Sequence, residues 1–315
     1  MRRHAFLFLL FALTVSSYVS AQAQTPAAAI NHFKDAIKKT NQGDLDGAIE
    51  DYSRAIALSS RFNVDKKGRA STNSFAGSET STDDIRVIDP FTANAYSNRG
   101  LARYQKGDYP GAIEDFNEAI RIRPSLEIAY LNRAAALRAN GDWQGALKDL
   151  DKAISLKKDF VEALTNRGSL YHDVGRDKEA LADLNRAIEL SDDIAEAFYQ
   201  RGYVYLVFNN LDASVKDFNR AIELAPNMAW AYQGRGTALM KKGQIQPAIN
   251  DFTQALKNKP ELVWAYMNRG LAKVYLGDES GAQSDFDACL KLNKDLKAQI
   301  DAKVELARHL RRLGK

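Results

Sequence analysis

The stretch NAYSNRGLARYQKGDYPGAIEDFNEAIRIRP, residues 94–124, contains two segments of helical periodicity separated by a Gly-Asp pair. The residues that recur three or four positions apart are Tyr96, Gly100 and Arg103 in the first segment, and Ala112, Phe116 and Ala119 in the second. That spacing places side chains on one face of a helix. Gly107 readily adopts the left-handed conformation that ends many helices. The stretch therefore predicts two helices joined by a tight turn, each with one inward stripe.

The same pattern recurs along the chain every 34 residues without a slip. Its copies begin at Ala95, Ala129, Ala163, Ala197, Ala231 and Ala265, and a further copy lies from Ile30 to Leu58. One helical hairpin cannot bury both of its faces, so such units are stabilised by stacking on their neighbours. The sequence predicts a linear array.

The 34-residue unit has an aromatic residue, a Gly or Ala four positions on, a Gly-Asp turn and then Ala, Phe and Ala at helical spacing. This pattern resembles the tetratricopeptide repeat family. The resemblance covers Ile30 to the C-terminus apart from one insertion. It implies an all-α fold, a right-handed α-solenoid of stacked antiparallel helix hairpins whose first helices line a concave face. After the last repeat, Ile300, Val304, Ala307 and Leu310 form one stripe, which predicts a C-terminal cap helix.

The repeats divide the chain into five predicted parts. These are a signal peptide at 1–23, a first hairpin at 24–60, an insertion at 61–90, six repeats at 91–296 and the cap helix at 297–315. The insertion is rich in Ser, Thr, Gly and charged residues, so we expect a mobile surface loop whose deletion leaves the array folded.

The N-terminus has the features of a secretory signal. Arg2 and Arg3 precede a short apolar run from Ala5 to Val15, and Ala21-Gln22-Ala23 offers the small residues that a signal peptidase accepts. The run is shorter than the roughly 20 apolar residues that span a bilayer. We therefore expect a secreted or periplasmic protein that is not inserted in the membrane after cleavage.

Composition and motifs argue against several functions. Lys and Arg exceed Asp and Glu by only 44 − 40 = 4, too few for a nucleic-acid surface. The four histidines are scattered, without a metal-binding or catalytic motif, and Cys289 is the single cysteine. We predict a protein that is not an enzyme and holds neither a cofactor nor a metal, with Cys289 as a small buried residue.

Charged residues occupy the inner stripes in every repeat. The predicted ladder comprises Asp51, Arg99, Asp115, Arg133, Asp149, Arg167, Asp183, Arg201, Asp217, Arg235, Asp251, Arg269, Asp285 and Lys303. A buried charge without a partner is costly, so the two signs should pair and specify register; a row of ligand-binding arginines is the alternative. Because the first copy has Asp35 where Arg is expected, we predict that each Asp meets the Arg of the following hairpin. Asp51 would then meet Arg99, and Asp285 would meet Lys303. A fork of each Arg to both neighbouring hairpins is also open.

The remaining candidate site is the face of the first helices. Its predicted peptide-binding residues are Tyr199, Gln200, Tyr203, Trp230, Gln233, Thr237, Trp264, Met267, Asn268 and Leu271. Equivalent positions further towards the N-terminus hold Ser97, Asn98, Leu131, Asn132, Thr165, Asn166 and Ser169. Aromatic rings could supply contact area there while Asn and Gln hold an extended peptide; alternatively, these side chains pack against neighbouring hairpins. The function classes that follow are an extracytoplasmic adaptor for other proteins or peptides and a self-associating structural protein.

Overall fold

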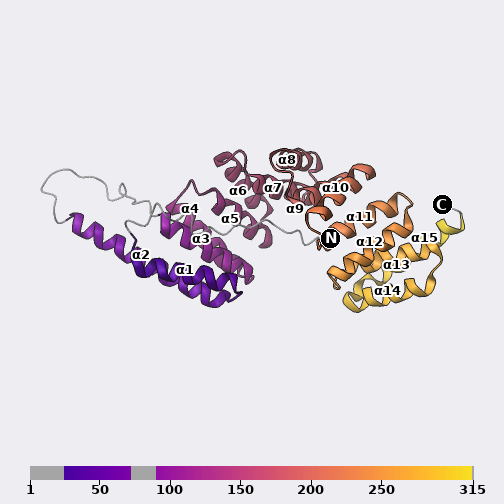
Figure 1. Ribbon diagram of the computed structural model, residues 1–315, viewed down its shortest axis with the longest axis horizontal. Coiled ribbons are helices and arrows are strands. Elements are labelled where there is room, and N and C mark those ends of the chain that lie inside the picture. The colour runs from indigo at the N-terminus through magenta and orange to yellow at the C-terminus, as the bar shows by residue number, and fades with distance from the viewer. Residues whose placement is uncertain (1–24, 72–89, 314–315) are drawn as a thin grey trace. The chain divides into compact units, whose positions relative to one another are not determined.

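The computed structural model describes residues 25–71 and 90–313, and these residues are helical apart from turns and short connections, without a strand (Figure 1). The first seven helices are α1 (Ala27–Asn41), α2 (Leu45–Ser71), α3 (Pro90–Gln105), α4 (Tyr109–Ile122), α5 (Glu127–Ala139), α6 (Trp143–Leu156) and α7 (Val161–Asp173). The others are α8 (Asp177–Leu190), α9 (Ala195–Val207), α10 (Leu211–Leu224), α11 (Ala229–Lys241), α12 (Ile245–Asn258), α13 (Val263–Leu276), α14 (Glu279–Leu292), a 3₁₀ turn (Lys294–Leu296) and α15 (Lys297–Arg312). The predicted all-α class with its C-terminal cap helix is confirmed.

The turn inside each hairpin follows from two residues. Gly107 has φ +84°, and the residue after it, Asp108, accepts a hydrogen bond from Gly111 N and so caps the start of α4. The left-handed conformation costs Gly little, and the carboxylate satisfies one of the free N–H groups of the first turn. One hairpin uses Asn209, φ 54°, in place of Gly. Asn is among the few other residues that adopt this conformation at modest cost.

The two helices of a hairpin approach closely where small residues meet a large ring. Ala112, Phe116 and Ala119 of α4 are fully buried, and a Cβ added at Gly100 of α3 would lie 2.9 Å from Phe116 Cε1. Real Cβ atoms are not found so close to a ring carbon. Gly100 is therefore required for this packing, as its place on the predicted inward stripe suggested.

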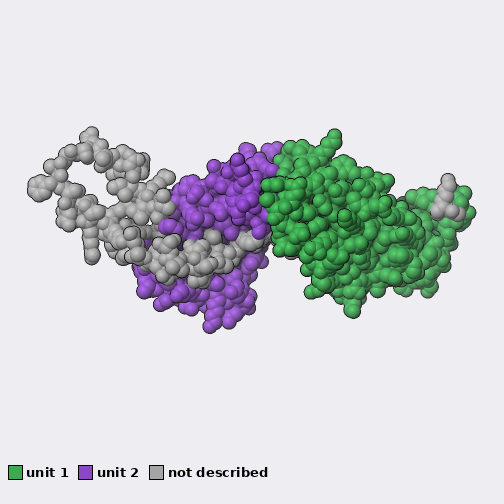
Figure 2. All heavy atoms as spheres, turned by 45° about the horizontal axis from the view of Figure 1, so that its top comes forward, with its two compact units in different colours: residues 1–5, 168–315 green, residues 6–167 purple. Residues whose placement is uncertain are grey.

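The described residues fall into two compact units, the first made of residues 25–71 and 90–167 and the second of residues 168–313 (Figure 2). In the first unit, Phe33 lies against the rings of Tyr52 and Phe91 at centroid distances of 5.5 and 5.4 Å. In the second unit, one cluster joins α13, α14 and α15 and includes Phe286 and Ile300. Each unit thus has its own core between stacked hairpins.

The insertion differs from the prediction at its start. Helix α2 continues to Ser71, so residues 61–71 are helical where a mobile loop was expected. Extending an existing helix adds a hydrogen bond for each residue that is fixed, without a new nucleation cost, and this segment contains no proline. The rest of the insertion, residues 72–89, and the predicted signal peptide lie outside the described residues.

Candidate functional site

The ladder charges pair within hairpins. Arg99 Nη2 donates to Asp115 Oδ1 at 2.6 Å and Arg99 Nε donates to Asp115 Oδ2 at 2.9 Å. The same bidentate contact, between residues sixteen positions apart, joins Arg133 to Asp149, Arg201 to Asp217, Arg235 to Asp251 and Arg269 to Asp285. The predicted pairing of each Asp with the Arg of the following hairpin is therefore wrong for these pairs. The antiparallel hairpin places its two inner stripes face to face, so its own Asp is the nearer partner.

Each ladder arginine also reaches back to the preceding hairpin. Arg133 Nη1 donates to Asn117 Oδ1 at 2.7 Å, and Asn117 follows the ladder residue Asp115 by two positions. The equivalent contacts are Arg99 to Ser53, Arg167 to Asp151, Arg201 to Asn185, Arg235 to Asn219 and Arg269 to Thr253. The fork that the sequence left open is thus present, with a different acceptor. A guanidinium has enough donors for both contacts, which an ammonium group could not make in the same plane.

Both ends of the ladder depart from the predicted partners. Asp51 accepts hydrogen bonds from Lys39 Nζ at 2.6 Å and His32 Nδ1 at 3.1 Å, not from Arg99. Lys39 lies one helical turn beyond Asp35, and Asp35 is exposed because no hairpin precedes it in the described chain. Although burial opposes ionisation, these two hydrogen bonds hold the pKa of Asp51 below its usual range.

At the other end, Asp285 binds Arg269 and Lys273, with Lys273 Nζ at 2.8 Å from Oδ2. Lys303 of α15 is exposed. The predicted Asp285–Lys303 pair is therefore wrong, and the cation again comes from one helical turn further along the first helix of the same hairpin.

Several predicted groove residues belong to hydrophobic packing. Met267 and Leu271 are 1% and 5% exposed, and they lie in one cluster with Ile300 and Val304 of α15. Trp264 is half-buried against the same cluster. For Met267 and Leu271 the prediction of an exposed groove position is wrong, because the cap helix covers this part of α13.

Trp230 is also a packing residue in part. It is half-buried against a cluster that includes Leu256 and Leu262, and the ammonium of Lys259 lies 5.4 Å from its ring centroid. Trp230 and Trp264, both predicted to bind a peptide, are thus half-buried, which agrees at least in part with the alternative that they pack against neighbouring hairpins. Both rings contribute to the junctions between hairpins.

The tyrosines of α9 form an aromatic cluster with α10. Tyr199 is 2% exposed, and its ring meets Tyr203 edge-on at 5.1 Å between centroids. Tyr203 in turn meets Phe218 edge-on at 5.2 Å. Desolvation raises the pKa of Tyr199 and Tyr203 far above that of a free phenol, so both stay neutral at physiological pH.

Several buried side-chain oxygens on the same faces lack a hydrogen-bond partner, although the Nε2 of Gln200 donates to Glu196. Gln200 and Gln233 are 0% and 3% exposed, and the acceptor oxygens Gln200 Oε1 and Gln233 Oε1 have no hydrogen bond in the described part of the chain. In the first unit the same holds for Asn94 Oδ1 and Ser97 Oγ. Thr237 and Asn268 are half-buried, and Thr237 Oγ1 donates to Gln233 O. A buried polar group without a partner costs about 1–3 kcal/mol, so these atoms need an explanation.

Gly234 has a packing role that was not predicted from the sequence. A Cβ at this position would lie 2.4 Å from Phe218 Cζ, and one at Gly202 would lie 2.9 Å from Phe218 Cε1. Two glycines from neighbouring first helices thus hold one ring. The sequence did contain a sign of this role, because Gly234 is a glycine at a repeat position where the other copies have an amide side chain. These equivalents are Asn98, Asn132, Asn166, Gln200 and Asn268.

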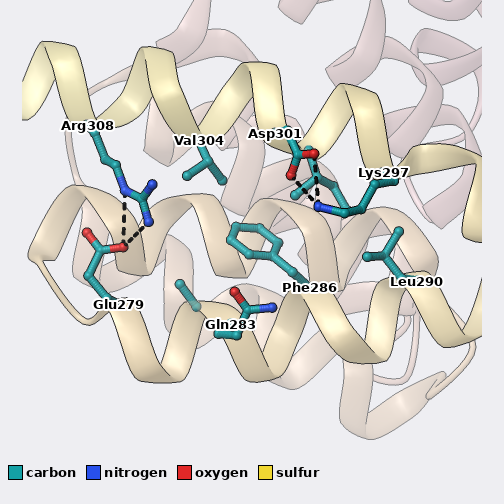
Figure 3. A pocket seen from close by; sticks show the side chains of 10 residues that line it. Glu279, Gln283, Phe286, Leu290, Lys297, Asp301, Val304 and Arg308 are labelled. Atoms are coloured by element: carbon teal, nitrogen blue, oxygen red, sulfur yellow. Dashed lines mark hydrogen bonds and ion pairs between the residues drawn. The ribbon is translucent and has the colours of Figure 1, made fainter.

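The cap helix is held to α14 by ion pairs around a small cavity (Figure 3). Arg308 Nη2 lies 2.8 Å from Glu279 Oε2, as Figure 3 shows. Arg311 Nη2 lies 3.1 Å from Glu279 Oε1. The cavity has a volume of about 140 Å³ and is lined by Phe286, Val304 and their neighbours. Two hydrogen-bonded arginines lower the pKa of Glu279, with Arg308 the stronger influence.

Between residues 25–71 and 90–313, no three His, Cys, Asp or Glu side chains are grouped so that they could bind a metal ion. Over the same ranges, no helix combines the length and hydrophobicity that crossing a bilayer requires.

Two family models match the chain. One, described as TPR repeat, matches residues 100–141, 134–175 and 168–206, and the other, described as Tetratricopeptide repeat, matches 195–228, 231–262 and 265–296. The chain belongs to the tetratricopeptide repeat family. Tetratricopeptide repeat proteins bind other proteins or peptides and generally act as non-catalytic scaffolds.

Known relatives match parts of the chain or its fold. The small glutamine-rich tetratricopeptide repeat-containing protein 2 of Mycosarcoma maydis is 34% identical over 95 residues, which are 29% of this chain and 27% of that protein. A tetratricopeptide repeat protein from Parabacteroides merdae has a TM-score of 0.61 at 20% identity, over 90% of this chain and 99% of its own. A chain of the APC/C hetero-tetramer Cut9-Hcn1 has a TM-score of 0.64 at 15% identity, over 68% of this chain and 42% of its own. At such identities these structures show the fold alone.

Proposed function

We propose that this tetratricopeptide repeat protein is an extracytoplasmic scaffold that binds extended segments of other proteins along the faces of its first helices. The observation that supports this most is the set of buried acceptor oxygens without partners, Gln200 Oε1 and Gln233 Oε1 in the second unit. An extended segment carries a backbone N–H at every residue, and these donors would satisfy the two amides.

The burial of these amides sets a condition on binding. A segment would reach Gln200 and Gln233 only after this face opens, because the two side chains are 0% and 3% exposed. Binding of the segment is favoured because each new hydrogen bond removes the cost of an unpaired buried oxygen, about 1–3 kcal/mol.

Selection of peptides from a displayed random library would test the proposal. We expect the selected peptides to bind the Gln200→Ala, Gln233→Ala double variant at least tenfold more weakly than the unchanged chain. The matched control is Gln246→Ala, Gln254→Ala on the second helix α12, which we expect to bind as before. Equal binding by all three proteins would place the peptide site elsewhere.

The extracytoplasmic part of the proposal is supported by the sequence of residues 1–23 and needs its own test. We expect the protein expressed in a Gram-negative host to be recovered from the periplasm. Its mass should be that of a chain that begins at Gln24, after cleavage behind Ala23. A full-length chain in the cytoplasmic fraction would contradict this location.

A further inference from the structure

A second surface lies where the turn between α11 and α12 meets the ends of α13 and α15. Here a cleft of about 620 Å³ is lined by Met240, Lys241, Gly243, Ile245, Tyr275, Leu310 and Arg311. Pockets that bind ligands commonly have about 300–1,000 Å³. All of its lining residues belong to the second unit.

The walls of this cleft are apolar. Met240, Ile245, Tyr275 and Leu310 are half-buried, and each therefore presents part of its side chain to solvent. Two residues close in sequence to the lining, Leu276 after Tyr275 and Leu313 three residues after Leu310, are 53% and 56% exposed. Four partly exposed apolar side chains that line one cleft are typical of an interaction surface.

The charges at the rim are cationic. Lys241 is exposed, and within residues 25–71 and 90–313 it forms neither an ion pair nor a hydrogen bond. Arg311 lines the cleft and is balanced by Glu279, which it shares with Arg308. None of the lining residues is acidic.

The hairpin turn at this cleft also lacks the acid that caps other second helices. Asp44, Asp108, Asp142 and Asp278 each accept a hydrogen bond from the backbone N–H three residues on. Gln244 stands at the equivalent position, and Pro247, three residues on, has no N–H to donate. An acidic residue at position 244 would therefore have no N–H at position 247 to accept from. This turn lacks the negative charge that the capping aspartates give to these other turns.

From this cleft we infer that the second unit docks an acidic, apolar segment of another protein, with a large apolar side chain between Met240 and Tyr275 and a carboxylate at Lys241. Apolar contact area supplies the affinity, while the unpaired Lys241 favours acidic over basic segments. The inference rests on the proposed function in that the ligand is a protein segment. It places the contact at a different surface from Gln200 and Gln233.

Two fluorescein-labelled hexapeptides and the purified full chain test the inference by fluorescence anisotropy. One peptide has a central Phe-Leu pair flanked by two glutamates on each side, and the other has lysines in place of the glutamates. We expect the acidic peptide to bind at least tenfold more tightly than the basic one. A third peptide, with Ser-Ser in place of Phe-Leu, should bind at least tenfold more weakly than the acidic Phe-Leu peptide.

Variants of the chain locate the site. Lys241→Glu should weaken the acidic peptide at least tenfold, while Lys216→Glu, an exposed charge reversal on α10, should leave its affinity unchanged. The Gln200→Ala, Gln233→Ala variant should bind the acidic peptide normally, which separates this cleft from the face of the first helices.

Three results would overturn the inference. They are equal affinity for the acidic and basic peptides, normal binding by Lys241→Glu, and loss of binding in the Gln200→Ala, Gln233→Ala variant alone. Sedimentation with phosphatidylglycerol vesicles that depends on Lys241, in the absence of peptide binding, would show that the cleft meets a membrane and not a protein.

Discussion

Arg235 links two hairpins, because its Nη1 donates to Asn219 Oδ1 at 2.7 Å while its Nε and Nη2 hold Asp251 at 2.8 and 2.7 Å. Asn219 belongs to α10, and Asp251 belongs to α12. The position of α11 is thus fixed from both sides by one side chain.

Replacing Arg235 with Lys should therefore destabilise the protein although the charge is kept. An ammonium cannot make the two-pronged contact with Asp251 and also reach Asn219, so we expect a loss of about 2–3 kcal/mol, below the roughly 3–5 kcal/mol for removing one partner of a buried pair. Urea unfolding followed by circular dichroism measures it. Arg186→Lys, at an exposed ion pair with Glu189, is the matched control and should change stability little. Equal losses in the two variants would show that the fork contributes nothing.

Gly234→Asn should be strongly destabilising, even though Asn is the residue at four of the equivalent positions. The new Cβ would lie 2.4 Å from Phe218 Cζ, and overpacking of this kind typically costs about 1–3 kcal/mol. In a double-mutant cycle, Phe218→Leu should cost stability by itself and recover part of the loss caused by Gly234→Asn. Additive losses would mean that the ring is not what excludes a side chain here.

The ion pair at the start of the ladder should make stability depend on pH. The folded pKa of Asp51 is lowered, so its contribution is present above the unfolded pKa of about 3.9 and is lost as the pH falls through the folded pKa. Lys39→Met removes one of the hydrogen bonds that lower this pKa. We expect the variant to melt below the unchanged chain at pH 7, with the difference shrinking below about pH 4 as Asp51 becomes protonated. Lys38→Met on the same helix is the control, and a difference that stays constant from pH 7 to pH 3 would contradict the assignment.

Cys289 should report whether the cap helix is closed. The residue is fully buried in the cluster beneath α15, and burial raises the pKa of its thiol. A thiol reagent should therefore react slowly in the folded protein, through openings of the cap. Glu279→Gln removes the carboxylate that holds Arg308 and Arg311, and we expect labelling to become about fivefold faster, in line with a loss of about 1 kcal/mol from surface ion pairs. Unchanged labelling would mean that the cap opens without breaking these contacts.

The hairpins could be predicted from the sequence because Tyr96, Gly100, Ala112 and Phe116 follow the helical period within a short segment. The ladder pairing could not, because a repeat of 34 residues offers each Asp two arginines at equivalent positions and periodicity alone does not choose between them. Lys39, which pairs with Asp51, was not predicted as its partner because it lies one helical turn beyond Asp35, the repeat position where the other copies have arginine. The burial of Met267 and Leu271 depends on where α15 packs, which no local pattern specifies.

The fork has a consequence for how such a chain can change in length. Arg133, Arg201, Arg235 and Arg269 each take their Asp sixteen residues ahead and their second acceptor sixteen residues behind, as Arg133 does with Asp149 and Asn117. Excising residues 129–162, one whole 34-residue period, would bring Arg167 opposite Asn117, the acceptor that Arg133 uses now. Whole repeats can therefore be gained or lost by recombination between copies without leaving a junction unpaired, whereas an insertion of any other length inside the array must be looped out.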